Sequence, residues 1–123
     1  MSDSKKGGTI PRLRDAKTSE NVCGLIEAML QDDKAEDVTV LDLIGKTSIA
    51  DHMIIASGRS ARHVTAIADH IIDRLKEAGV DNVSVEGRQQ ADWILLDVGD
   101  VIIHLFRPEI RAFYNLEKMW AVP

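Results

Sequence analysis

The chain has 123 residues, of which 45% are hydrophobic and 28% charged, a composition typical of an ordinary globular protein with one domain. No apolar run approaches the roughly 18–20 residues needed to cross a bilayer. Cys23 is the single cysteine, which excludes an internal disulfide. Because the first residues also lack the apolar core of a secretory signal, we expect a cytoplasmic protein.

The formal net charge of −5 is unevenly distributed along the chain. Residues 1–17 carry five basic and two acidic side chains, a sum of +3, so residues 18–123 carry the remaining −8. The first segment has no periodic apolar pattern, which predicts a flexible basic tail before a single domain at 18–123. The acidic domain suits a basic protein partner better than the phosphates of a nucleic acid.

The first half of the domain predicts a helix and two strands. Thr18 or Ser19 can cap an amphipathic helix, in which Cys23 is interpreted as a small buried hydrophobe rather than a nucleophile. Residues 37–43 alternate in polarity and predict a strand. Residues 51–57 are nearly all apolar and predict a buried strand, with His52 as a half-buried, hydrogen-bonded strand residue.

The second half predicts a helix, three strands and a final helix. Ser60 can cap a helix that Gly79 ends, and a right-handed crossover would make the strand at 83–86 parallel to the strand at 51–57. Residues 93–98 and 101–106 form a predicted hairpin with a II′-type turn at Gly99 and Asp100. Pro108 opens the last helix. The predicted fold is α/β, with a mixed five-stranded sheet flanked by helices.

No predicted element carries a recognisable catalytic or metal site. The turn from Ser57 to Ser60 enters a helix, as anion sites do, but it lacks the spacing and lysine of a P-loop. A nucleotidyltransferase would also need two close acids on the next strand, which offers only Glu86. The four histidines do not have metal-ligand spacing. We therefore predict no metal and no cofactor.

The five aromatic residues all lie between Trp93 and Trp120. Along the first hairpin strand, Trp93, Leu95 and Asp97 point to one face, while the alternating residues are aliphatic and suit a core. An apolar anchor beside an acid is typical of a recognition face. The alternative is that the last helix covers this face and Asp97 pairs with Arg111. The pattern leaves both interpretations open.

Most of the chain, from about residue 20 to 120, resembles the Iojap-like ribosomal silencing factors of bacteria and organelles. The resemblance is carried by AD at 50–51, IIASG at 54–58, SARHV at 60–64, Gly87, WILLDVGD at 93–100, HLF at 104–106 and RAFYNLEKMW at 111–120. One departure is His52, because the family usually has an aromatic residue after Asp51.

The resemblance implies a fold related to nucleotidyltransferases without their catalytic motif, a homodimer, and no enzymatic activity. It further implies binding to the large ribosomal subunit through ribosomal protein L fourteen, which prevents joining with the small subunit and so represses translation. The residues that match the family's partner-binding face are Trp93, Leu95, Asp97, His104, Arg111 and Tyr114. Two alternatives are an enzyme of nucleotidyltransferase type that uses the Ser57–Ser60 turn, and a general dimeric adaptor with another partner.

Overall fold

The computed structural model describes residues 18–80 and 82–114, with side chains described as far as residue 111. Its centre is a five-stranded sheet with the strand order β1-β2-β5-β4-β3. Strands β2 and β5 are parallel, and every other neighbouring pair is antiparallel. The strands are β1 Glu36–Asp42, β2 His52–Ser57, β3 Ser84–Glu86, β4 Trp93–Asp97 and β5 Val101–Phe106. The predicted mixed five-stranded sheet is therefore confirmed.

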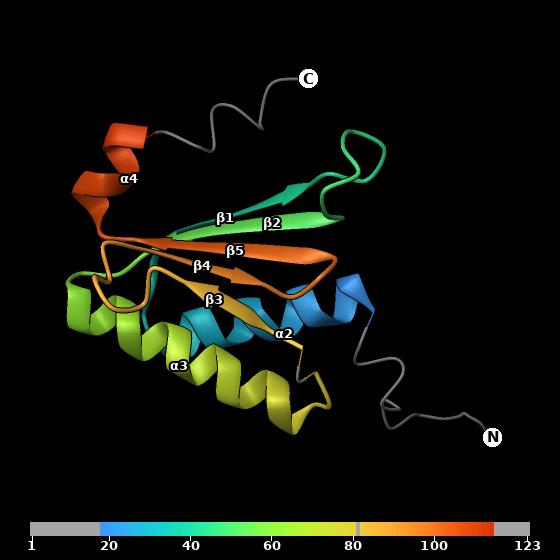
Figure 1. Cartoon of the computed structure of the whole chain (residues 1–123), viewed down its shortest axis with the longest axis horizontal. Coiled ribbons are helices and arrows are strands. Elements are labelled where there is room, and N and C mark those ends of the chain that lie inside the picture. Colours follow the sequence, from blue (N-terminus) through green and yellow to red (C-terminus); the bar gives the residue numbers. More distant parts are fainter. Residues whose placement is uncertain (1–17, 81, 115–123) are drawn as a thin grey trace.

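Two capped helices cover one face of the sheet (Figure 1). Helix α2 spans Ser19–Asp32, and the hydroxyl of Thr18 accepts a hydrogen bond from the backbone N–H of Asn21 at 3.3 Å. Helix α3 spans Ala61–Glu77, and Ser60 caps it as predicted by accepting from the N–H of His63 at 3.1 Å. Such caps satisfy N–H groups that would otherwise lack a partner in the first turn of a helix.

The main core lies between these helices and the sheet. Its members alternate along β2, β4 and β5 and recur every three or four residues along α2 and α3, as the sequence pattern predicted. The fully buried members with large side chains are Ile26, Leu30, Ile54, Ile67, Ile71, Leu75, Ile94, Leu96, Ile103 and Leu105. Each such side chain contributes roughly 2 kcal/mol relative to an exposed one.

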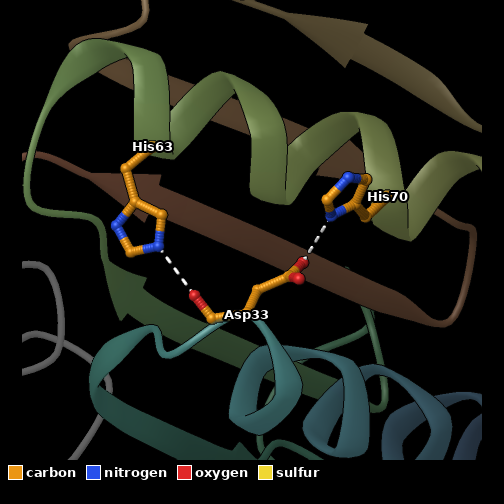
Figure 2. Close-up of polar contacts among 3 residues, drawn as sticks. All are labelled: Asp33, His63 and His70. Carbon is orange, nitrogen blue, oxygen red and sulfur yellow. Dashed lines mark hydrogen bonds and ion pairs between the residues drawn. The ribbon is translucent and has the colours of Figure 1, made fainter.

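A histidine pair fastens the end of α2 to α3 (Figure 2). The ring Nδ1 of His63 accepts from the backbone N–H of Arg59 at 2.9 Å, so its Nε2 carries the proton and donates to the backbone oxygen of Asp33 at 2.7 Å. Two turns further along α3, Nδ1 of His70 lies 2.9 Å from a carboxylate oxygen of Asp33. These contacts account for two of the four histidines as structural groups.

The second face of the sheet is packed differently. Helix α4, Pro108–Tyr114, lies on the side opposite α2 and α3 (Figure 1). Its Ile110 packs against a small buried cluster of Leu43, Met53, Ile55 and Phe106. Among the described residues, Leu41 on β1 and Trp93 on β4 also pack against this cluster. This face therefore changes from a buried region under α4 to a solvent-exposed region toward the β3–β4 edge.

Strand β3 is not adjacent to β2, although a simple strand–helix–strand crossover would suggest that it is. It runs in the same direction as β2, as predicted, but β5 and β4 lie between them. The handedness rule for a strand–helix–strand unit fixes direction and side, and leaves open how many strands the helix passes. Here the hairpin of β4 and β5 fills the space, and β3 becomes an edge strand.

Candidate functional site

The candidate site is built on the hairpin of β4 and β5. Gly99 has φ +88°, and the N–H of Val98 bonds to the oxygen of Val101 at 3.0 Å, so the chain reverses within the predicted turn. A turn of this length fixes the register of the strands. It sets Trp93 opposite Phe106, Leu95 opposite His104, and Asp97 opposite Ile102 on the face away from α2 and α3.

Three rings form a packed group on this face. The centroids of Trp93 and Phe106 are 4.9 Å apart, and the rings of His104 and Phe106 stack with an interplanar angle of 14°. The indole N–H of Trp93 donates to Nδ1 of His104 at 2.9 Å. Phe106 is fully buried and His104 nearly so, whereas Trp93 is half-buried. The packing on Phe106 and the hydrogen bond to His104 thus hold the indole in one orientation.

Burial lowers the pKa of His104 from 6.5 to about 4. The ring is therefore neutral near pH 7, with its Nδ1 as an acceptor and its proton on Nε2. A neutral imidazole is the form that the Trp93 hydrogen bond requires. His104 acts here as a support for Trp93 rather than as a general acid or base.

The other two hairpin residues of the predicted face are more exposed. Leu95 is half-buried beside His104, and Asp97 is exposed at the end of β4. One carboxylate oxygen of Asp97 accepts from the backbone N–H of Gly99 at 2.9 Å, which holds the side chain beside the turn. The structure therefore brings Trp93, Leu95 and His104 together, and Asp97 lies two residues beyond Leu95 on the same face of β4.

Arg111 lies apart from this group and is only 8% exposed. Its guanidinium donates to the backbone oxygen of Asp37, to the hydroxyl of Ser57 at 3.0 Å and to the hydroxyl of Thr39 at 3.2 Å. The alternative pairing with Asp97 is therefore wrong. Arg111 therefore fastens α4 to β1 and β2.

The remaining predicted member of the face is only partly described. The backbone of Tyr114 belongs to α4, but its side chain lies outside the described residues. The predicted basic tail at residues 1–17 also lies outside them. Their assignments stay predictions.

Sequence reasoning missed a hollow beside Trp93. Glu86, Gly87, Trp93 and Leu95 line a surface depression of about 260 Å³ at the β3–β4 edge. Glu86 is exposed and stands opposite Leu95, and Gly87 adopts φ +81°. A Cβ atom at Gly87 would lie 2.2 Å from the backbone oxygen of Trp93, so only glycine fits. The alternation of the strand at 83–86 was the available signal, because it separates Glu86 from the core-facing Val85.

The Ser57–Ser60 turn is occupied by contacts within the chain. The Ser57 hydroxyl accepts from Arg111, the N–H of Arg59 donates to His63, and Ser60 caps α3. These are the groups that a phosphate would need. Across residues 18–80 and 82–114, no three His, Cys, Asp or Glu side chains are grouped so as to hold a metal ion.

Cys23 is buried in helix α2, and His52 is partly buried at the start of β2. Cys23 is 5% exposed, and burial together with the charge of Glu27 raises its pKa to about 11, which confirms a buried hydrophobe. The backbone N–H of His52 bonds to Asp100 at 3.1 Å. The expectation of a hydrogen-bonded ring is not met at Nδ1, which is buried and has no hydrogen-bond partner within the described part of the chain.

Comparison with known proteins decides the family. The family model described as "Ribosomal silencing factor during starvation" matches residues 16–122. The chain belongs to this ribosomal silencing factor family. A ribosomal silencing factor from Zymomonas mobilis is 54% identical over 101 residues, which cover 82% of this chain and 76% of that protein. The resemblance to Iojap-like ribosomal silencing factors is therefore confirmed, and the family gives the chain a ribosome-associated silencing role.

A more distant relative and a solved structure extend the comparison. The mouse protein named "Mitochondrial assembly of ribosomal large subunit protein 1" is 31% identical, and the match covers 80% of this chain and 44% of that protein. A crystal structure of a Chromobacterium violaceum protein superposes with a TM-score of 0.82 at 38% identity, covering 86% of this chain and 88% of the other. Among the described helices of this silencing factor, none is long and apolar enough to cross a membrane.

Proposed function

We propose that this silencing factor binds the large ribosomal subunit through ribosomal protein L fourteen and thereby blocks joining with the small subunit. The observation that carries the proposal is the row of Trp93, Leu95 and Asp97 on a rigid hairpin, in a chain that belongs to the silencing family. The name of the mouse relative, which refers to the large ribosomal subunit, supports the choice of subunit.

The chemistry of the face fits a protein partner. Half-buried Trp93 and Leu95 offer apolar area that a partner could desolvate, and Trp is the residue type most enriched at binding hot spots. The exposed carboxylate of Asp97 can orient a basic partner during approach. A net charge of −8 on residues 18–123 favours basic protein surfaces and disfavours direct contact with phosphates. The proposed role is steric and non-enzymatic, because the bound domain occupies the surface that the small subunit would meet.

Cosedimentation with separated ribosomal subunits tests the proposal. We expect the protein to pellet with large subunits and not with small ones, and to reduce the fraction of joined ribosomes in a sucrose gradient. Trp93→Ala should weaken both effects by roughly 30-fold or more, as hot-spot truncations do. Wild-type protein that stays in the supernatant at micromolar concentration would refute the proposed binding.

Because Trp93 also packs on Phe106, Trp93→Ala removes a contact within the fold as well as a contact for the partner. A second variant therefore tests the same face without removing that packing. Leu95→Glu adds a charge to the half-buried position beside it and should abolish binding while the domain stays folded. Ile44→Glu is the matched control, because Ile44 is 58% exposed in the loop between β1 and β2. Equal binding by the two glutamate variants would show that the hairpin face is the wrong surface.

Two further measurements separate the alternatives. Sedimentation equilibrium tests the homodimer that we also propose, which would have twice the 13.6 kDa of the chain. Calorimetric titration with nucleoside triphosphate and Mg²⁺ tests the enzyme that would use the Ser57–Ser60 turn, and we expect no heat of binding. A dimer without any ribosome binding would instead favour the general adaptor.

A further inference from the structure

The hollow at the β3–β4 edge combines three kinds of surface. Glu86 supplies an exposed carboxylate, Leu95 an apolar wall, and Trp93 an aromatic ring. The strand register brings them together, because Glu86 pairs with Leu95 and Trp93 is the next residue on the same face of β4. Diagonal neighbours of this kind lie within reach of aromatic and long side chains.

Two arginines that adjoin β3 and β5 in the sequence form ion pairs with other acids. Arg88, two residues after Glu86, forms a two-pronged contact with Asp69 on α3, with distances of 2.8 and 2.7 Å. Arg107 pairs with Asp92 at 2.8 Å. Within residues 18–80 and 82–114, no basic side chain forms an ion pair with Glu86. The carboxylate is therefore available to a cation from outside the chain.

We propose that this hollow receives a cationic side chain, lysine or arginine, from the ribosomal protein partner. The cation would pair with the Glu86 carboxylate, and its aliphatic stem would pack along Leu95. A cation beside an indole ring gains a further electrostatic attraction to the ring. The charge of −8 on the domain attracts such a side chain, whereas a phosphate would be repelled.

The inference rests on the proposed function, since it assigns a second contact to the same partner-binding face. It extends that face from the hairpin to β3, which the family resemblance did not include. It also gives the partner a definite chemistry at this position. An apolar peptide or a nucleic acid would leave the Glu86 carboxylate without a counter-charge, which is unfavourable once water is excluded.

Charge variants of Glu86 test the inference by binding to isolated large ribosomal subunits. Glu86→Gln keeps the shape of the side chain and should weaken binding about tenfold, as loss of one partner of an interfacial ion pair does. Glu86→Lys should weaken it by about 100-fold or more, because two cations would then meet. The salt dependence of the affinity should also become shallower in Glu86→Gln.

Glu27→Gln and Glu27→Lys are the matched controls, because Glu27 is exposed on α2, on the opposite side of the sheet. They change the net charge equally and should leave binding within about twofold of wild type. Thermal unfolding of each variant checks that the exposed substitutions leave the fold intact.

The outcomes distinguish the inference from the function on which it rests. If wild-type protein binds large subunits and Trp93→Ala weakens binding, but both Glu86 variants bind as tightly as wild type, the hollow does not receive a cation. If the Glu27 variants lose as much affinity as the Glu86 variants, the effect is one of net charge and the inference is also overturned. If wild-type protein does not bind at all, the proposed function itself fails.

Discussion

Acidification should destabilise the domain through His104. Burial lowers the pKa of this ring from 6.5 to about 4, so the folded protein holds it neutral over a range in which the unfolded chain protonates it. The stabilisation is fully present above pH 6.5 and is lost as the pH falls toward 4. Below that value both states carry the proton.

The size of the effect follows from the two pKa values. With 1.36 kcal/mol for each pKa unit, the complete loss is roughly 3 kcal/mol. Linkage gives a loss of roughly 1 kcal/mol by pH 5.5 and roughly 2.5 kcal/mol by pH 4.5. Protonation also removes the acceptor for the indole N–H of Trp93, so the proposed binding face should loosen over the same range.

Urea unfolding followed by circular dichroism at pH 7, 5.5 and 4.5 measures the loss. His104→Asn is the comparison, because its amide oxygen can accept from Trp93 at about the position of Nδ1 and does not titrate between pH 4 and 7. Subtracting the two proteins cancels the other titrating groups. A difference in the free energy of unfolding that stays constant from pH 7 to 4.5 would refute the assignment of His104 as a neutral buried support.

Three other predictions concern the framework of the site. In thermal unfolding, Gly87→Ala should destabilise the domain by at least about 2 kcal/mol, because the added Cβ would meet the backbone of Trp93. Gly99→Ala is the comparison: its φ of +88° is similar but the space around it is open, so it should destabilise the domain by about 1 kcal/mol. Arg111→Met should cost about 2–4 kcal/mol in urea unfolding, because three acceptors on β1 and β2 lose their donor; a change under 0.5 kcal/mol would contradict that role. Cys23 should react with a thiol reagent roughly 100-fold more slowly than a free cysteine, given its pKa of about 11, and labelling at the rate of glutathione would contradict its burial.

Local patterns predicted the hairpin and the two long helices because the sequence determines them over short distances. A turn at Gly99 and Asp100 sets the strand register, and that register alone puts Leu95 opposite His104. Caps at Thr18 and Ser60 determine where the helices begin. The side of each strand that faces the core follows from alternation.

Contacts between distant segments could not be predicted in the same way. The burial of Arg111 depends on an irregularity in β1, where the pairing register shifts between Glu36 and Thr39 and Asp37 adopts φ +50°. That shift accompanies the contact between the Asp37 carbonyl and the guanidinium. The hollow beside Glu86 depends on β3 pairing with β4 rather than lying next to β2. Alternation along the strand at 83–86 separates Glu86 from the core, but neither the register shift in β1 nor the pairing of β3 with β4 has a signal within a single element.

Under the proposed function, one face of the sheet serves stability and the other serves recognition of the partner. The face under α2 and α3 is buried along β2, β4 and β5, while the other changes from buried Phe106 through half-buried Leu95 to exposed Asp97 and Glu86. A protein that acts by occupying a surface gains from a face that is already ordered, because less conformational entropy is lost on binding. Substitutions at exposed Glu86 and Asp97 should therefore change ribosome binding with little effect on unfolding. Substitutions at His104, which supports the indole, should change both together, so the depth of a residue on this face determines which of the two properties it controls.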